Sequence, residues 1–446
     1  MSIRNISRRQ FLRQTGLLAG AVAAFPAVVH GANANSVVQV AVVGVNGQGG
    51  SDLSEIGSHP KVKFVGFCDV DKKQFEKADQ KFPGVPHFTD YREMLASLGD
   101  RCDAVQVSTP DHMHAPVAMT AMMKGKHVYC QKPLAHTVWE IRQMRLQADK
   151  SQVVTQMGNH IHSHMFYRMG SRLLREEAIG KIKEVHSYIG VQGRQYNHRT
   201  DRPPEAPVPE NLDWNLWIGA APMRPYAADA YHPFKWRDWQ DFGGGALGDF
   251  GCHVLDPIFS GLELTAPLSM RAEHEGTNRE VWPGPETIHF VFPGTPHTAG
   301  KELSVVWRDG GLLPPLDHPF LPAGLKLPKG GGGSLIIGET GAMLLPHWAK
   351  PRLYPEAKFE QFKFPEEKSR NHYHVWVNAI LANKRTSDGF HYSGPLAETV
   401  QLGNVAARFP GQELKWDAKA LKVTNSTEAD ALITKTYRAG WEVAAA

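Results

Sequence analysis

Residues 37–53 read VVQVAVVGVNGQGGSDL, and this stretch decides the fold. Its opening run is short, apolar and rich in β-branched valine, which predicts a buried strand. Glycines follow at positions 44, 47 and 49, and a helical pattern begins after them. Backbone N–H groups at the start of such a helix bind phosphate groups. The stretch therefore predicts the first strand, turn and helix of a dinucleotide-binding domain.

The glycine pattern departs from the usual G-x-G-x-x-G frame at one position. A frame that begins at Gly44 would place glycines at 46 and 49, but Asn46 occupies the middle position and Gly47 follows it. Asparagine tolerates positive φ better than most residues. We expect the cofactor to contact Gly44, Asn46, Gly47, Gln48 and Gly49. The alternative is a cofactor-free domain of the same fold with a tight glycine turn.

The second predicted strand, KVKFVGFC at residues 61–68, leads into Asp69. An acid at this place binds the ribose hydroxyls of NAD. No arginine follows Asp69 to accept the 2′-phosphate of NADP. The sequence therefore predicts NAD in preference to NADP.

Two further loops follow predicted strands, STPDHMH at 108–114 and CQKP at 130–133. Ligands of open parallel sheets bind at the carboxyl ends of the strands, where such loops lie. We therefore expect cofactor contacts from the following residues of these loops: Ser108, Thr109, Pro110, His112, His114, Gln131 and Lys132.

The order of strands and helices predicts two domains. Strands alternate with helices over residues 35–157, which predicts a Rossmann domain with a doubly wound parallel sheet. Over residues 158–446 strand-like runs come first and helices late, which predicts an α+β substrate and oligomerisation domain with a largely antiparallel open sheet. The predicted fold class is therefore α/β.

Residues 1–34 are predicted to be a targeting segment. SRRQFLR at 7–13 matches the twin-arginine pattern, an apolar run follows, and the small residues Ala32-Asn33-Ala34 predict cleavage near Ala34. The alternatives are an ordinary secretory signal and an uncleaved anchor. The apolar run is short for a bilayer, so we expect a periplasmic protein without stable membrane insertion.

The charge balance excludes one class of partner. Residues 1–34 hold four of the 49 basic residues and none of the 45 acidic ones, so the rest of the chain is balanced. We therefore expect no nucleic-acid partner.

A later stretch, GGGALGDFGCHVLD at 243–256, completes a resemblance to the glucose-fructose oxidoreductase / inositol dehydrogenase / MocA (Gfo/Idh/MocA) family. The family's Glu-Lys-Pro motif corresponds to Gln131-Lys132-Pro133, and its Asp-x-x-x-His pair corresponds to Asp249 and His253. TQMGNHIHS at 155–163 and YHPFKWRDW at 231–239 resemble an exported bacterial branch. The resemblance implies an NAD(P)-dependent oxidoreductase of a sugar, polyol or glycoside that forms a homo-oligomer, a dimer or tetramer.

Lys132, Asp249 and His253 form the predicted catalytic set, because the resemblance places Lys132 near the nicotinamide. Asp249 and His253 are four residues apart on a predicted helix and share one face, so we expect the carboxylate to orient the imidazole. His253 is suited to take the hydroxyl proton of the substrate near neutral pH. The alternative is a surface ion pair with an unrelated loop lysine.

Five polar residues are predicted to bind substrate. Asn159 and His160 lie at the expected cleft, and Tyr231, His232 and Lys235 are polar members of an aromatic segment that we otherwise assign to packing. His160, His162 and His164 alternate as they would on one face of a strand. No acidic or cysteine ligand accompanies them locally, so no metal site is predicted.

Three functions stay open from the sequence. The first is a sugar- or polyol-directed oxidoreductase with a tightly held nicotinamide, since a folded protein could be exported with NAD enclosed. The second is an NAD-dependent glycoside hydrolase, lyase or epimerase that oxidises its substrate transiently. The third is a catalytically inactive carbohydrate-binding relative.

Overall fold

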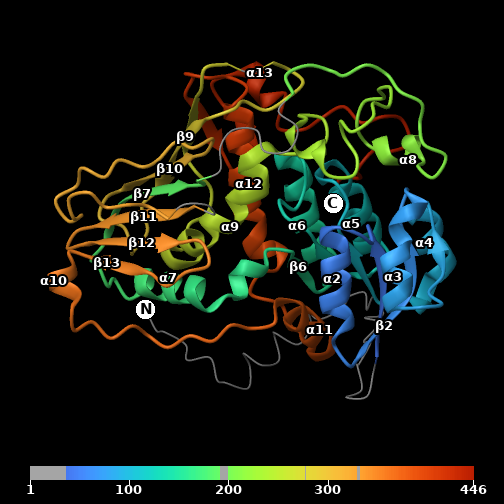
Figure 1. Ribbon diagram of the computed structural model, residues 1–446, viewed down its shortest axis with the longest axis horizontal. Helices are drawn as coiled ribbons and strands as arrows, with labels where there is room; N and C mark the ends of the chain where they lie inside the picture. Colours follow the sequence, from blue (N-terminus) through green and yellow to red (C-terminus); the bar gives the residue numbers. More distant parts are fainter. Residues whose placement is uncertain (1–36, 191–198, 277, 329–331) are drawn as a thin grey trace, which may run out of the picture. The chain divides into compact units, whose positions relative to one another are not determined.

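A six-stranded parallel sheet contains the first strands of the chain, drawn in blue and teal in Figure 1. The computed structural model describes residues 37–190, 199–276, 278–328 and 332–446. The strand order is β3-β2-β1-β4-β5-β6, so the chain reverses its direction of progress between β1 and β4. Ligands of open α/β sheets bind at such a reversal. The strands are β1 (Val38–Val43), β2 (Val62–Cys68), β3 (His87–Phe88), β4 (Ala104–Val107), β5 (His127–Cys130) and β6 (Thr155–Met157).

Helices connect these strands and cover both faces of the sheet. They are α2 (Gln48–Gly57), α3 (Phe75–Lys81), α4 (Tyr91–Leu98), α5 (His114–Met123) and α6 (Val138–Ser151). Thr137 and Glu140 form a capping box that begins α6. A helix from much later in the chain, α11 (His372–Ala382), packs on α2 and β1 through Trp376 and Val377. The predicted boundary at residue 157 assigned that helix to the second domain.

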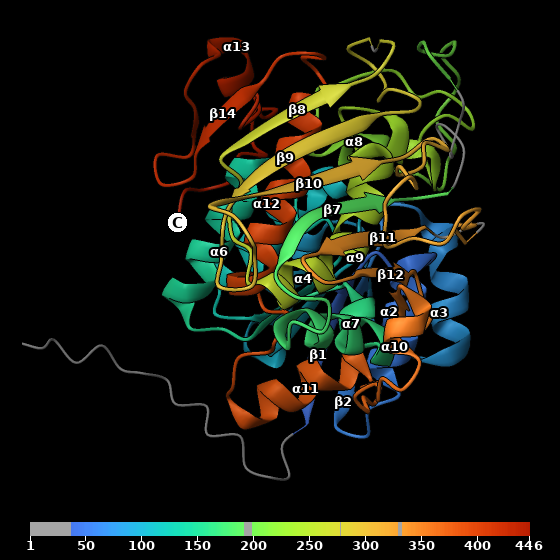
Figure 2. The same ribbon diagram turned by 90° about the vertical axis from the view of Figure 1, so that its left-hand side faces the viewer.

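The second sheet has nine strands in the order β13-β12-β11-β7-β10-β9-β8-β14-β15 (Figure 2). All neighbours pair antiparallel except β7 and β10, which are parallel. The strands are β7 (Ile182–Tyr188), β8 (Ser269–Glu273), β9 (Thr287–Pro293), β10 (Glu302–Arg308), β11 (Gly333–Gly338), β12 (Ala342–Pro346), β13 (Arg352–Tyr354), β14 (Leu414–Asp417) and β15 (Lys422–Val423). The predicted α/β class, with a largely antiparallel second sheet, is confirmed.

Three long helices lie between the two sheets in Figure 1. They are α7 (Met165–Arg175), α9 (Gly245–Leu262) and α12 (Phe390–Ala406). α12 packs on α6 and β6 of the parallel sheet and also on β8 and β9. A shared core runs through this layer, so the two sheets are joined by packed side chains. Short helices α8 (Trp214–Ile218), α10 (Glu356–Phe359) and α13 (Thr427–Asp430) complete the helical elements.

The C-terminal segment returns to the parallel sheet. Its Ile433 carbonyl accepts a hydrogen bond from Trp139 N–H at 2.9 Å, at the start of α6. Arg92, on α4, lies 4.2 Å above the ring of Trp441. The segment thereby contacts two helices of the first sheet.

The predicted signal segment and its cleavage site lie outside the described residues. Among the residues that the structure describes, no helix is long and apolar enough to cross a membrane. All four cysteines are buried.

Candidate active site

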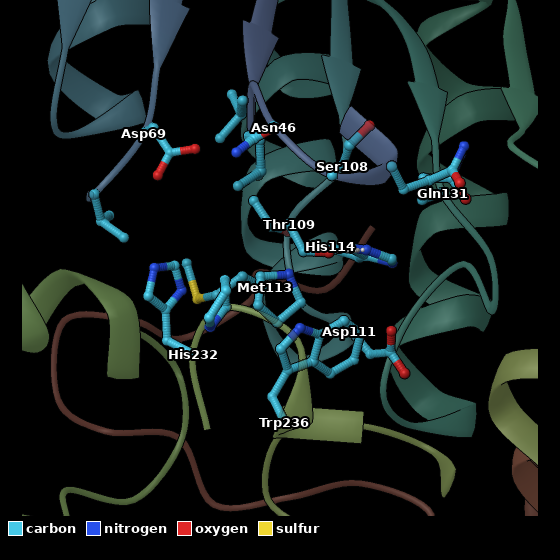
Figure 3. A pocket seen from close by; sticks show the side chains of 18 of the residues that line it. Asn46, Asp69, Ser108, Thr109, Asp111, Met113, His114, Gln131, His232 and Trp236 are labelled. Carbon is cyan, nitrogen blue, oxygen red and sulfur yellow. Dashed lines mark hydrogen bonds between the residues drawn. The ribbon is translucent and has the colours of Figure 1, made fainter. Parts of the chain in front are cut away.

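A cavity of about 750 Å³ opens at the carboxyl ends of β1, β2, β4 and β5. Figure 3 shows Asn46, Asp69 and Ser108 at the strand ends, with His232 and Trp236 on the facing segment. The cavity therefore lies at the reversal of strand order, where an open α/β sheet binds ligands.

The glycine turn allows a close approach of β1, α2 and the loop after β4. Gly44 has φ 86°, and a Cβ placed there would lie 2.5 Å from the Ser108 carbonyl oxygen. A Cβ on Gly49 would overlap the Gly44 carbonyl. Gly47 precedes α2 with φ 57° and, among the described residues, faces open space. The turn thus forms a cradle at a helix N-terminus that suits a pyrophosphate. The Asn46 amide donates to Gln74 at 2.6 Å.

Asp52, a buried residue of α2, joins the turn to the next two loops. Its carboxylate accepts hydrogen bonds from Gln48 at 2.9 Å, Ser108 at 2.8 Å and Gln131 at 2.7 Å. Burial raises the pKa of Asp52 to about 6. An amide at position 131 can donate to this carboxylate, whereas the family's usual glutamate would place a second acid beside it. The departure at Gln131 is thus matched to Asp52.

Asp69 follows β2 and lines one end of the cavity. Its carboxylate accepts from the backbone N–H groups of Val45 at 3.2 Å and Asp71 at 3.0 Å. Burial raises the pKa of Asp69 to about 6. The carboxylate is therefore mostly ionised at neutral pH and can accept hydrogen bonds from ribose hydroxyls.

Lys132 and Asp249 line the cavity close to Asp111, which Figure 3 shows on the side away from Asp69. The Lys132 ammonium donates to the Asp249 carboxylate in a short ion pair and to the Asp249 carbonyl at 2.8 Å. The Arg237 guanidinium also reaches that carboxylate, at 3.4 Å. Asp111 is buried close by, and burial raises its pKa to about 7 against the lowering effect of Arg237 and Lys132. Two cations and two carboxyl groups thus meet beside the cavity.

His253 lines the same cavity and is oriented by Asn159. The Asn159 amide nitrogen donates to the Cys252 carbonyl at 3.0 Å, which leaves its oxygen to accept from His253 Nδ1 at 2.6 Å. Nε2 of His253 then carries the lone pair. Burial, followed by the Lys132 charge, lowers the pKa of His253 well below its ordinary value. The imidazole is therefore neutral and able to accept a proton.

Two family profiles match the chain. One, described as an oxidoreductase family with an NAD-binding Rossmann fold, covers residues 38–159, and the other, described as its C-terminal alpha/beta domain, covers residues 181–283. The chain belongs to the Gfo/Idh/MocA oxidoreductase family. The Rossmann domain of this Gfo/Idh/MocA protein is an NAD-binding one, as the glycine turn and Asp69 indicate.

Among curated relatives, the family member is 29% identical over 231 residues to an alpha-N-acetylgalactosaminidase of Shewanella oneidensis. It is 28% identical over 153 residues to a levoglucosan dehydrogenase of Pseudarthrobacter phenanthrenivorans. These alignments cover 44% and 34% of this chain. They span only 49% and 31% of the relatives' own lengths.

Solved structures share the fold of this Gfo/Idh/MocA protein. The WlbA dehydrogenase from Chromobacterium violaceum, in complex with NADH and UDP-GlcNAcA, has a TM-score of 0.61 at 16% identity, over 88% of this chain and 99% of that one. The aldose-aldose oxidoreductase from Caulobacter crescentus has a TM-score of 0.55 at 16% identity, over 85% and 100% of the two chains. At this identity the likeness establishes the fold.

The residues present fit NAD in this family member. The cradle at Gly44 and Gly49 leaves no room for side chains. The buried hydroxyl of Thr109 lines the cavity and has no hydrogen-bond partner among the described residues. Asp69 lies on one side of the cavity, and Asp111, which is close to Lys132, lies on the other (Figure 3). An extended dinucleotide would therefore find polar groups at each end.

Most of the residues predicted to contact the cofactor line the cavity, and Gly49 and His112 do not. Pro110 and His114 line it, and the His114 Nε2–H donates to the Thr109 carbonyl at 2.8 Å. His112 does not, because its ring is fully buried and donates to the Trp217 carbonyl at 3.0 Å. The structure therefore does not bring His112 to the cavity with the other residues of its loop.

The expected pairing of Asp249 with His253 also needs correction. The two residues share one helix as predicted, but Asn159 binds His253 Nδ1 while the Asp249 carboxylate binds Lys132. Asn159 is fully buried, both polar atoms of its amide are engaged, and it does not line the cavity, so its contact in the structure is with His253.

Of the other four residues predicted to bind substrate, two line the cavity and two do not. His160 lines the cavity, with its ring 5.6 Å from that of His253. Tyr231 is buried in an aromatic cluster, stacks on Trp214 and does not line the cavity. His232 lies toward the Asp69 end, where it donates to Asp71 at 2.9 Å. Lys235 pairs with Asp229 at 2.6 Å, outside the residues that line the cavity.

Several site residues were missed in the sequence. Asp111 falls within the STPDHMH loop, and Trp236 and Arg237 lie within the YHPFKWRDW stretch, so both segments carried a signal. Arg237 stacks on Trp236 with its guanidinium carbon 4.3 Å from the ring centre. Asp52 gave no signal, because its role depends on partners 56 and 79 residues away.

Proposed function

We propose that this chain is an NAD-dependent oxidoreductase that acts on a carbinol carbon of a sugar, polyol or glycoside. The observation that supports this most directly is that Lys132 and His253 line the same cavity as the glycine turn. One ligand can thus reach the phosphate cradle while a second meets an ammonium and a neutral imidazole. These groups are what the oxidation of an alcohol needs.

Bound NAD would supply the hydride acceptor in this reaction. His253 accepts the hydroxyl proton at Nε2, because Asn159 holds the hydrogen on Nδ1. The Lys132 ammonium donates a hydrogen bond to the reacting oxygen and stabilises its developing negative charge. Asp249 holds Lys132 through its carboxylate and its carbonyl, and this fixes the ammonium in the cavity wall.

A panel of aldoses, polyols and methyl glycosides tests the proposal. We expect the absorbance of reduced nicotinamide to appear with at least one class, and Lys132→Ala to abolish it. Unchanged turnover in that variant would contradict the role of Lys132, whereas sugar binding without reduction of nicotinamide by any class would favour an inactive carbohydrate-binding protein.

Relatives favour a second candidate, a glycoside-cleaving enzyme that oxidises its substrate only transiently. An alpha-N-acetylgalactosaminidase and several glycosyl hydrolase family 109 proteins are among the similar sequences. The two candidates differ in net redox change. Cleavage of an unactivated glycoside without net accumulation of reduced nicotinamide would support the second, and accumulation would support the first.

We further propose that the protein is exported in folded form by the twin-arginine route and carries its NAD into the periplasm. The SRRQFLR motif supports this. The test is to purify the protein from the periplasm, denature it and assay for released nicotinamide. Protein that contains none and also fails to bind added NAD would contradict both the export of bound cofactor and the enzyme assignment.

We also propose that the chain assembles as a dimer or tetramer through its second sheet. Residues 316–327 pack across β11 and β12, whereas outward side chains of β8 and β10, such as Arg271 and Glu302, are exposed. Light scattering of the purified protein tests this, and a monomeric mass would contradict it.

A further inference from the structure

Three side chains outside the cavity lie close together at α9, the helix that carries Asp249 and His253. His162 lies in the short helix His160–Ser163, Asp256 on α9, and Asp388 just before α12. One nitrogen or oxygen atom of each lies within 4.8 Å of those of the other two. Histidine nitrogen and carboxylate oxygen are ligands of divalent transition cations.

Asp388 is a buried carboxylate that lacks a partner among the described residues. Its side chain is 1% exposed, and neither of its carboxylate oxygens has a hydrogen-bond partner among the described residues. Burying a carboxylate without a partner is costly, so such groups are normally paired or bound to a metal. Asp256, a second buried carboxylate, lies within the same cluster and adds to the negative charge.

The histidine nearest to Asp388 does not compensate this charge. His372 Nε2 is 3.9 Å from Asp388 but donates to the Met157 carbonyl at 2.9 Å. Its Nδ1 lies 3.0 Å from the Ser163 hydroxyl, which can donate to it. One ring nitrogen of His372 thus donates and the other can accept, as in a neutral imidazole. The nearby group that can carry a positive charge is His162: burial lowers its pKa, but the charges of Asp256 and Asp388 outweigh burial and raise it, so without an ion the ring is protonated.

The spacing of the other two groups suits a metal ion. Nδ1 of His162 lies 2.9 and 3.1 Å from the two oxygens of Asp256. Neighbouring ligands of an octahedral ion with bonds of about 2.1 Å are about 3 Å apart. The Tyr392 hydroxyl donates to Asp256 at 2.9 Å and holds that carboxylate in place.

We propose that His162, Asp256 and Asp388 form a binding site for a divalent transition cation of the zinc or manganese type. Binding would release the extra proton of His162, and the two carboxylates and the neutral imidazole would then carry two negative charges, which a divalent ion neutralises. The sequence predicted no metal site, because Asp256 and Asp388 are remote from the histidines along the chain.

The ion would lie outside the cavity and would hold in place the segments that carry Asn159 and His253, the proposed base. His162 comes three residues after Asn159, and Asp256 comes three residues after His253. A cation that joins His162 to Asp256 therefore ties together the two segments that hold the Asn159–His253 hydrogen bond. It also ties them to the loop that leads into α12.

Metal titration of the full chain tests the site independently of any enzymatic activity. Purified protein, stripped with a chelator, is titrated with Co²⁺ and followed by its visible absorption, and Zn²⁺ and Mn²⁺ are then added in competition. We expect one ion per chain, and a melting temperature that rises by about 3 °C or more with saturating Zn²⁺. The chain takes up no ion at micromolar concentrations if the inference is wrong.

Asp388→Asn and His162→Gln localise the binding. Both changes remove a ligand, and His162 is the more exposed member, so His162→Gln is the milder test of folding. We expect each to weaken Co²⁺ binding at least about 100-fold. Asp309→Asn is the matched control, since Asp309 is equally buried but binds Trp307 instead, and it should bind Co²⁺ as the wild type does. Variants of Asp388 and His162 that bind within tenfold of wild type would overturn the assignment.

Discussion

The side-chain oxygen of Asn159 lies 2.6 Å from Nδ1 of His253 and fixes which nitrogen of the imidazole carries the hydrogen. Because the amide nitrogen of Asn159 is held by the Cys252 carbonyl, the amide cannot turn without losing that bond. A neutral amide thus orients the proposed base, whereas Asp249 is committed to Lys132. This division keeps the imidazole uncharged between turnovers.

Asn159→Asp should make the reaction sensitive to mild acid. A carboxylate beside Nδ1 stabilises the imidazolium and raises the pKa of His253, so the base becomes protonated at higher pH. We expect the acidic limb of kcat/KM to move upward by roughly one pH unit or more. Asn159→Ala serves as its control: it should lower kcat/KM roughly 10- to 100-fold at all pH values, without that upward displacement. A profile of Asn159→Asp that superimposes on the wild type would show that Asn159 does not position the base.

Removal of the Lys132 charge should lower turnover strongly but leave the bound cofactor in place. We expect Lys132→Met to lower kcat by roughly 10³-fold, because the developing charge on the substrate oxygen loses its donor. Asp249→Asn should lower kcat by a smaller factor, since the carbonyl of residue 249 still accepts a hydrogen bond from Lys132. Nicotinamide content after denaturation is the control measurement. Loss of the cofactor together with activity would indicate a binding role for Lys132.

Asp69 should decide between NAD and NADP and should make binding dependent on pH. Asp69→Ala should weaken NAD binding roughly 10-fold and raise the relative affinity for NADP, because the carboxylate repels a 2′-phosphate. In the wild type, NAD affinity should fall as the pH drops below about 6, where Asp69 becomes protonated. Fluorescence titration of cofactor-free protein measures both. Equal losses for NAD and NADP in the variant would contradict this role.

Restoring the family's usual glutamate with Gln131→Glu should destabilise the protein most at alkaline pH. The new carboxyl would sit where Gln131 now donates to Asp52 at 2.7 Å, so the pair would bind protons more tightly when folded than when unfolded. Stability then falls as the pH rises above about 4, and we expect a loss of roughly 2 kcal/mol more at pH 8 than at pH 5. Thermal melts at both pH values measure it. Adding Asp52→Asn should remove most of the pH dependence, and an equal loss at both pH values would refute the coupling.

Asp111→Asn should remove a similar loss of folding stability, one that the wild type suffers as the pH rises. The folded pKa of Asp111, about 7, lies above its ordinary value, so the folded wild type loses stability as the pH rises from about 4 to 7. The variant lacks this loss. The melting temperature of the variant minus that of the wild type should therefore be larger at pH 8 than at pH 4.5. A constant difference between the two proteins across that range would show that Asp111 is ionised throughout.

The parallel sheet could be predicted because its information is local. Valine-rich strands, the glycines at 44, 47 and 49, and Asp69 lie within one short part of the chain and follow known rules of strand–turn–helix geometry. The expected positions of Lys132 and His253 came instead from the resemblance to the family's Glu-Lys-Pro and Asp-x-x-x-His motifs. The short strands β12 to β15 were missed because they depend on pairing with remote partners.

Side-chain roles were harder to predict, since burial and hydrogen bonding are decided by distant segments. Tyr231 and His112 are polar residues in promising loops, yet tertiary packing encloses both. Asn159 binds an atom of Cys252, 93 residues further along the chain, and no sequence pattern reports such a contact. The spacing of Asp249 and His253 was correct for one helix face, but a stronger partner, Lys132, competed for the carboxylate.

Trp441 and Gly44 line one cavity although almost the whole described chain separates them. Closing so long a loop costs entropy, which only the contacts of the docked C-terminal segment recover. The crevice is therefore complete only once the C-terminal segment has settled on α4 and α6. A dinucleotide that enters beforehand is enclosed by that final docking step. We expect its residence time to follow the rate at which the tail detaches, more than the strength of any single contact at the turn.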